Sequence, residues 1–258
     1  MSITDTAEEI KMYAEVNGLK MYYEVHGDGL PLVVLHGGLH SIDVSFGALL
    51  PWLAENFQVI AVDLQGHGRT GDIDRPPLLE HLAADVVALL DLLGVERADL
   101  FGYSLGGLVA LTAATHHPDR VRRMVLAATH FRQDGYHDEI HDGDEDSDRM
   151  PTQEEFESWH AAYTRVAPDP GNFEEFGQKV SGVVHSFRDW TPEELLAITA
   201  PTLLVVGDND FVRISHAELM RDLLGDARLA VLPDTRHTEV TQRVDLVVPM
   251  VTTFLRRP

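Results

Sequence analysis

The chain alternates between short apolar runs and longer amphipathic segments, a pattern that predicts a sheet covered by helices. Continuous apolar runs of about five or six residues are typical of strands buried on both faces of a parallel sheet. The runs that we interpret as such strands are 31–35, 57–62, 97–101, 123–128, 202–206 and 227–232. Between them, 78–93 repeats leucine and valine along one helical face, and 216–224 and 239–256 also have helical patterns.

The N-terminal part has a different period. Apolar and polar residues alternate over 10–26 on either side of Asn17-Gly18, a preferred two-residue hairpin turn. We therefore predict an α/β fold with a doubly wound, mostly parallel sheet that begins with an antiparallel hairpin.

One segment, 130–190, contains no strand pattern. Thr152 and Glu155 have the spacing of a capping box, and the helix that they open places aromatic residues on one face. A second helix is expected over 172–187. We predict a core domain of residues 1–129 and 191–258, with residues 130–190 inserted as a helical cap.

Composition limits the possible partners. The 258 residues carry a formal net charge of −22, which argues against nucleic acid and anionic membranes and favours a small-molecule substrate. The chain has no cysteine, which excludes disulfides, thiolate nucleophiles and cysteine-based metal sites. The acidic first residues lack the pattern of a signal peptide, and no apolar run is long enough to span a membrane. We expect a cytoplasmic protein.

The pattern Gly102-x-Ser104-x-Gly106 lies between a predicted strand and an apolar helix. At such a tight turn the serine is held out with its hydroxyl exposed, at a backbone strain of roughly 1–3 kcal/mol. A side chain at either glycine would collide where strand and helix backbones meet. The turn predicts a nucleophilic Ser104.

A serine nucleophile needs a base, and the base needs a buried acid. In doubly wound hydrolase scaffolds the order along the chain is serine, acid, histidine. Asp210 follows the 202–206 strand and is our choice of acid, with Asp208 as the alternative; His237 follows the last strand and is the expected base. The backbone N–H groups of Leu105 and Gly38, with Leu39 as the alternative to Gly38, are the expected oxyanion hole.

These residues resemble the α/β-hydrolase superfamily. His36-Gly37-Gly38 is similar to its oxyanion loop, and 63–70 to its D-x-x-G-x-G-x-S/T loop, with Thr70 replacing the usual serine. Arg236 stands where a small residue is more common. The resemblance to esterase-, lactonase- and perhydrolase-like members implies an acyl-enzyme mechanism that needs neither a metal nor an organic cofactor.

The pocket is expected to lie under the cap. The residues that we expect to line it are Leu39, His40, His130, Phe156, Trp159 and Tyr163, although the last three could instead join the cap to the core. The acidic stretch 137–146 does not match an EF-hand and is interpreted as a solvated loop, with cation binding left open.

The predicted function is hydrolysis of a neutral, moderately apolar carboxylic ester or lactone. Two further chemistries, carbon–carbon bond hydrolysis and cofactor-free perhydrolysis, would use the same three side chains. A receptor that binds a ligand and turns it over slowly is the alternative from a different class.

Overall fold

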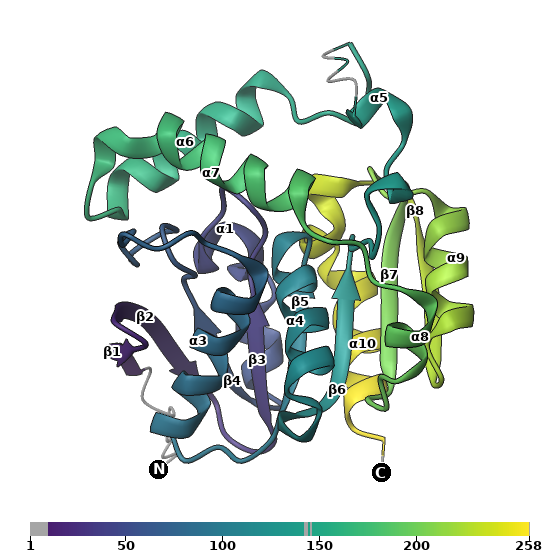
Figure 1. The fold of residues 1–258 in the computed structure, drawn as a ribbon, viewed down its shortest axis with the longest axis horizontal. Helices are drawn as coiled ribbons and strands as arrows, with labels where there is room; N and C mark the ends of the chain where they lie inside the picture. The colour runs from purple at the N-terminus through teal and green to yellow at the C-terminus, as the bar shows by residue number, and fades with distance from the viewer. Residues whose placement is uncertain (1–9, 142–143, 145, 258) are drawn as a thin grey trace, which may run out of the picture.

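The computed structural model describes residues 10–141, 144 and 146–257. Within them, eight strands form one sheet in the order β1-β2-β4-β3-β5-β6-β7-β8 (Figure 1). The strands are β1 Ile10–Val16, β2 Leu19–His26, β3 Pro31–Leu35, β4 Gln58–Val62, β5 Ala98–Tyr103, β6 Val121–Ala127, β7 Thr202–Asn209 and β8 Ala227–Arg236.

The strand directions confirm the predicted fold class. β1 and β2 form an antiparallel hairpin, β2 pairs antiparallel with β4, and every later pair is parallel. Asn17 and Gly18 both have positive φ, at 49° and 82°, as a type I′ turn requires. The parallel strands therefore end at a common edge, where α/β sheets place their ligand sites.

Helices cover both faces of the sheet, and an apolar core packs against each face. One core packs α3 Leu79–Leu92, α4 Leu105–His116, α8 Pro192–Leu196 and α9 Ile214–Leu223 against the strands. The other packs α1 Ile42–Phe46, α2 Leu50–Ala54 and α10 Val244–Leu255 against the opposite face. Short 3-10 turns lie at Pro118–Arg120, Gln133–Gly135, Pro170–Asn172 and His237–Gln242.

The segment 130–190, which we call the cap, carries α5 Asp138–His141, α6 Gln153–Val166 and α7 Phe173–Ser186. Its helices α6 and α7 lie above the carboxyl edge of the strands (Figure 1). The capping box at the start of α6 is present, with Thr152 and Glu155 each bonding the other's backbone N–H. Buried Phe173, Phe176 and Val180 recur at helical spacing along α7, so this face is turned inward.

The prediction of one continuous helix over 239–256 is wrong. The chain instead forms a 3-10 turn, η4, at His237–Gln242, and α10 starts at Val244. Arg243 breaks the helix with φ −82° and ψ 63°, and its guanidinium bonds the carbonyls of Pro233 and Asp234. The break lets the chain return to the sheet edge before it leaves along α10.

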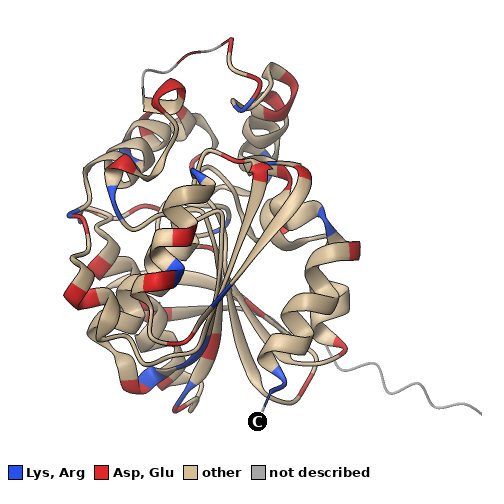
Figure 2. Cartoon of the chain, turned by 90° about the vertical axis from the view of Figure 1, so that its right-hand side faces the viewer, with Lys and Arg blue, Asp and Glu red and all other residues tan. Residues whose placement is uncertain are grey.

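Acidic residues outnumber basic ones on the helices and loops outside the sheet (Figure 2). No helix within the described residues is both long and apolar enough to cross a membrane.

Candidate active site

Ser104 lies at the sharp turn between β5 and α4. Its φ of 51° and ψ of −116° fall in a region that residues other than glycine rarely adopt. Hydrogen bonds hold this backbone: the Ser104 N–H donates to the Ala127 carbonyl at 2.8 Å, and the Ser104 carbonyl accepts from the Gly107 N–H at 2.9 Å. Hydrogen bonds to β6 and α4 thus hold the strained backbone of Ser104, and the residue stays partly exposed at the sheet edge.

The two flanking glycines are required by close backbone contacts. A Cβ on Gly102 would lie 2.3 Å from the Gly106 carbonyl oxygen, and one on Gly106 would lie 2.0 Å from the Leu35 carbonyl oxygen. These distances are far inside van der Waals contact. The close packing presses the turn against the end of β3, where the loop containing Gly38 begins.

Three side chains that are remote in sequence meet at this turn. His237 Nε2 lies 3.0 Å from Ser104 Oγ, and His237 Nδ1 lies 2.6 Å from Asp210 Oδ1. Asp210 is fully buried and accepts the N–H groups of Gly207 and Val212, each at 3.2 Å. Since a buried carboxylate is stabilised by such bonds, Asp210 can hold the ring of His237 in one orientation and support its charged form.

Asp208, the alternative acid, lies elsewhere. It is exposed, and its carboxylate accepts the N–H groups of Asp234 and Thr235 at 2.9 and 3.0 Å. It therefore ties the end of β7 to the turn before His237.

Two aromatic residues that the sequence reading missed also hold His237. The ring of Phe211 stacks on the imidazole, with centroids 4.0 Å apart and planes 7° apart. The Tyr103 hydroxyl donates to the His237 carbonyl at 3.1 Å. Each residue is a direct sequence neighbour of a predicted site residue, Ser104 or Asp210, which is the signal that could have identified it.

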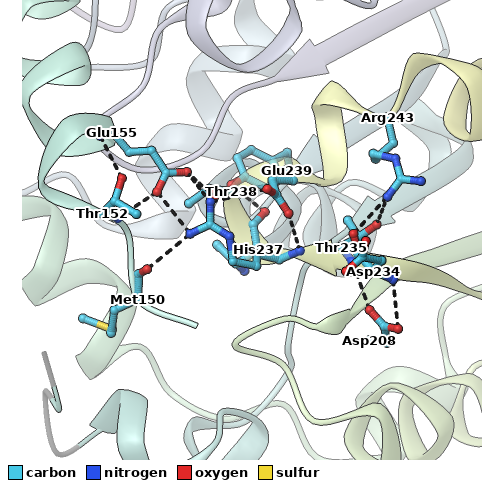
Figure 3. Close-up of polar contacts among 12 residues, drawn as sticks. Met150, Thr152, Glu155, Asp208, Asp234, Thr235, His237, Thr238, Glu239 and Arg243 are labelled. Atoms are coloured by element: carbon cyan, nitrogen blue, oxygen red, sulfur yellow. Dashed lines mark hydrogen bonds and ion pairs between the residues drawn. The ribbon is translucent and has the colours of Figure 1, made fainter. Parts of the chain in front are cut away.

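The cap also contacts the chain on both sides of His237. Figure 3 shows Glu155, at the start of α6, beside Thr238. The Thr238 hydroxyl donates to Glu155 Oε1 at 2.7 Å, and Arg236 pairs with the same carboxylate at 3.0 Å. Burial raises the pKa of Glu155, but bonds from Thr152, Thr238 and Arg236 outweigh burial and lower it to about 2. Arg236, the unusual residue of the sequence pattern, is thus a cap contact.

The loop after β3 lies against the nucleophile. A Cβ on Gly37 would lie 3.6 Å from the Cβ of Ser104, and Gly38 lines the same cavity as Ser104. His36 fixes this loop: its Nε2 accepts the Leu64 N–H at 3.0 Å, so its Nδ1 carries the proton donated to the Gly37 carbonyl. Burial lowers the pKa of His36 to about 4, which keeps this neutral tautomer.

Leu105 is the first residue of α4, so its N–H has no carbonyl partner in the preceding turn of the helix. The N-terminus of a helix carries a partial positive charge and suits an anion. The Leu105 N–H is thus a backbone donor next to Ser104, and Gly38 lines the same cavity.

The loop 63–70 holds backbone near the Gly38 loop in place through a buried carboxylate. The buried Asp63 carboxylate accepts the N–H groups of Ile42 and Arg69 at 2.8 and 2.9 Å. A Cβ on Gly68 would lie 2.3 Å from this carboxylate. The motif therefore holds the segment that follows the Gly38 loop.

Ser104 and His237 open into a cavity of about 250 Å³ between the sheet edge and the cap. Of the predicted pocket residues, Leu39, His40 and Trp159 line it. His40 is neutral, because burial and the nearby His36 and His237 lower its pKa to about 3. Cavity-lining residues outside the prediction include Tyr136, Ile140, Met150, Val180, Val184 and Phe211.

The other three predicted pocket residues lie outside this lining. Phe156 is 44% exposed and its ring packs against Phe173, and Tyr163 is buried against Phe173 and Phe176 within the cap. His130 is buried with its ring 4.0 Å from that of Tyr136. Phe156 and Tyr163 pack the cap helices together, because the face of α6 that they share turns toward α7.

Part of the acidic stretch 137–146 lies outside the described residues, namely Asp142, Gly143 and Glu145. Among the residues that the structure does describe, no group of three His, Asp or Glu side chains could hold a metal ion.

Comparisons with known proteins agree with this fold. Residues 31–153 match the family model of the alpha/beta hydrolase fold. The chain is 29% identical to a non-heme haloperoxidase of Rhodococcus erythropolis, over 93% of this chain and 97% of that protein. It is 35% identical to the 2-hydroxymuconate semialdehyde hydrolase of Pseudomonas sp. strain CF600 over 49% of this chain, and spans only 46% of that relative's length.

Among solved structures, the enol-lactonase from Burkholderia xenovorans LB400 superposes with a TM-score of 0.75. The superposition covers 95% of this chain and all of that one, at 23% identity. At this identity the likeness is one of fold.

Proposed function

The chain belongs to the α/β-hydrolase superfamily, and on that premise we propose that it cleaves a neutral, moderately apolar carboxylic ester or lactone through Ser104, His237 and Asp210. One observation carries the proposal: the continuous contact from Ser104 Oγ through both ring nitrogens of His237 to a buried carboxylate. This is the arrangement that makes a serine hydroxyl nucleophilic at neutral pH.

In the first half of the reaction, Ser104 Oγ attacks the substrate carbonyl carbon while His237 Nε2 takes the hydroxyl proton. Asp210 stabilises the imidazolium that results. The carbonyl oxygen becomes an oxyanion, and the N–H groups of Leu105 and Gly38 donate to it. In other enzymes, losing one such donor costs about 2.7–4 kcal/mol of barrier.

The intermediate then collapses. The bond between the carbonyl carbon and the alcohol oxygen breaks, and the imidazolium of His237 gives its proton to that oxygen. In the second half His237 takes a proton from water, and the resulting hydroxide attacks the acyl-enzyme. The acid leaves and the proton returns to Ser104.

The cavity supports a neutral substrate. No Lys or Arg is among the described residues that line it, and most of the lining is aliphatic or aromatic. An anionic group placed there would be desolvated without a cationic partner, which is strongly unfavourable.

A fluorophosphonate probe and p-nitrophenyl esters test the proposal. We expect the probe to label Ser104 and the esters to be hydrolysed with release of p-nitrophenol. Ser104→Ala should abolish both while the variant folds, because alanine keeps the backbone contacts and lacks only the hydroxyl. Unchanged turnover in Ser104→Ala would refute Ser104 as the nucleophile, and labelling without turnover would favour a receptor.

Two of the relatives favour other chemistries as alternatives to ester hydrolysis. The semialdehyde hydrolase and the haloperoxidase named above are similar in sequence to this chain. Carbon–carbon bond hydrolysis of a diketone, or perhydrolysis of a carboxylic acid by hydrogen peroxide, would use the same side chains. A diketone substrate that is cleaved at least tenfold more efficiently than any ester would favour the first, and peracid formation would favour the second.

A further inference from the structure

A chain of hydrogen bonds runs from the backbone of the loop after β3 to the ring of His40. The Gly37 N–H donates to Ser45 Oγ at 3.1 Å, and Ser45 Oγ lies 3.0 Å from His40 Nδ1. Ser45 belongs to α1 and is fully buried, and among the described residues its hydroxyl has no other hydrogen-bond partner. A buried hydroxyl without an acceptor is unfavourable, so the Ser45 proton is donated to His40 Nδ1.

The direction of this bond decides which nitrogen of His40 carries the proton. An uncharged imidazole has one N–H donor and one acceptor nitrogen. Burial, His36 and His237 lower the pKa of His40 to about 3, so its ring is uncharged at neutral pH. Since Nδ1 accepts the proton of Ser45, Nε2 carries the N–H. His36 on the same loop is the opposite case, because its Nε2 accepts and its Nδ1 donates.

His40 Nε2 is open to the catalytic cavity. Among the described residues nothing bonds this atom, yet it is not one of the buried side-chain atoms that lack a hydrogen-bond partner, so it is accessible. His40 as a whole is only 6% exposed and lines the cavity together with Ser104 and His237, so the access is from the cavity. The cavity therefore holds an uncharged N–H donor that the proposed steps of ester hydrolysis do not use.

The position of His40 indicates that this donor serves a part of the substrate other than the oxyanion. The proposed oxyanion donor Leu105 begins α4, on one face of the sheet, whereas Ser45 anchors His40 to α1, which packs against the other face. The ring of His40 also packs edge to face against Trp159 of the cap, with centroids 4.6 Å apart. The donor thus lies where the core meets the cap.

Most of the cavity lining is aliphatic or aromatic, so an N–H group there has few partners. A substrate that displaces water from the cavity and lacks an acceptor would leave this donor unpaired, which is unfavourable and selects against that substrate. We propose that the preferred esters or lactones carry a second uncharged oxygen near the scissile carbonyl, in an ether, hydroxyl or keto group, which accepts the N–H of His40 Nε2. This inference rests on the proposed function.

Paired substrates that differ by one oxygen test the proposal. One pair is p-nitrophenyl methoxyacetate and p-nitrophenyl butanoate, and the other is 2-methoxyethyl butanoate and butyl butanoate. We define the oxygen preference as kcat/KM of the ether-containing ester divided by that of its partner; comparing it between variants cancels the intrinsic reactivity of the esters. His40→Leu should lower the oxygen preference about tenfold in at least one pair, because the ether oxygen would be desolvated without a donor.

Two further variants distinguish a donor from a side chain that only fills space. A glutamine side chain also offers an N–H donor, so His40→Gln should keep the oxygen preference within about threefold of the wild type. His160→Leu is the matched control, because His160 follows Trp159 on α6, is exposed and does not line the cavity. It should keep the wild-type oxygen preference. An equal fall in kcat/KM for both members of each pair in His40→Leu would contradict the inference, because it would place His40 with the oxyanion or the loop.

Nitrogen-15 NMR of the wild-type protein tests the tautomer without any dependence on the folding of a variant. Long-range proton–nitrogen spectra distinguish Nδ1–H from Nε2–H rings, and we expect Nε2–H for His40 and Nδ1–H for His36. An Nδ1–H ring at His40, or an unchanged oxygen preference in His40→Leu with both pairs, would overturn the inference while ester hydrolysis stands. Failure of the wild type to hydrolyse any ester would instead overturn the proposed function.

Discussion

Glu155→Gln is the most informative substitution outside the three central side chains. Glu155 joins the cap to both neighbours of His237, through the Thr238 hydroxyl and the Arg236 guanidinium. Glutamine keeps the size of the side chain and can still serve in a capping box, so the start of α6 should remain intact. The substitution removes only the negative charge and one acceptor.

The contacts of Glu155 indicate how much Glu155→Gln should lower the free energy of unfolding. Burial raises the pKa of Glu155 and the bonds lower it, with a net fall from 4.5 to about 2; at about 1.4 kcal/mol per pKa unit, this net shift corresponds to about 3.5 kcal/mol. Both partners of the ion pair are about a quarter exposed, and glutamine retains the bond to Thr152. We therefore expect Glu155→Gln to lower the free energy of unfolding by about 1–2 kcal/mol.

Urea unfolding at two pH values measures this charge directly. The pKa of Glu155 is lower in the folded protein than in the unfolded chain, so its contribution is complete above about pH 4.5 and is lost as the pH falls toward about 2. The stability difference between wild type and Glu155→Gln should therefore be largest at pH 7 and smaller at pH 3.5. Glu154→Gln, an exposed neighbour in the same helical turn, controls for loss of charge at the helix start.

Ester kinetics distinguish whether the contact of Glu155 with Thr238 and Arg236 positions the cap residues of the cavity or positions His237. Met150, Pro151 and Trp159 flank Glu155 in sequence and line the cavity, whereas His237 is also held by Asp210, Phe211 and Tyr103. We expect KM to rise severalfold, up to about tenfold, with little change in kcat. An equal stability loss at both pH values, or a fall in kcat at constant KM, would refute this reasoning.

Three further predictions follow from the contacts around His237. Asp210→Asn should lower kcat by about 10³–10⁴, whereas Asp208→Asn should lower stability in urea and change kcat less than threefold; the reverse order of kcat would reassign the acid. Gly207→Ala should abolish stable folding in a thermal melt, because its Cβ would lie 1.9 Å from the Thr235 carbonyl oxygen; a wild-type melting temperature would contradict this contact. Tyr103→Phe should lower the free energy of unfolding by about 1–3 kcal/mol, because the buried His237 carbonyl loses its donor, and a neutral effect in urea would show that the bond is dispensable.

The sheet could be predicted because each buried parallel strand is a continuous apolar run that needs no knowledge of its neighbours. β3, for example, covers the predicted 31–35 without change. The same holds for the capping box of α6, which depends on residues three positions apart. The meeting of Ser104, Asp210 and His237 could be anticipated because parallel strands end at one edge and each residue follows such a strand.

The contacts that depend on the direction of a side chain could not be predicted. The aromatic residues Phe156, Trp159 and Tyr163 share a helical spacing, yet only Trp159 lines the catalytic cavity, whereas Phe156 and Tyr163 pack against Phe173 of α7. The break at Arg243 depends on carbonyls of the preceding turn, and the Arg236–Glu155 pair joins residues from different parts of the chain. Such pairs follow from tertiary packing and leave no local pattern.

The negative net charge of the protein is compatible with an oxyanion in the proposed mechanism, because charges far from the site act on it only weakly. A net charge of −22 would oppose an oxyanion if its source lay in the site, but acidic residues outnumber basic ones mainly on the outer helices and loops (Figure 2). Salt screens exposed charges beyond about 8 Å at physiological ionic strength. Under the proposed function, the oxyanion forms beside the N-terminus of α4 and the Gly38 loop, where backbone dipoles act at short range. The proposal therefore needs no cationic side chain to stabilise the transition state of a neutral substrate.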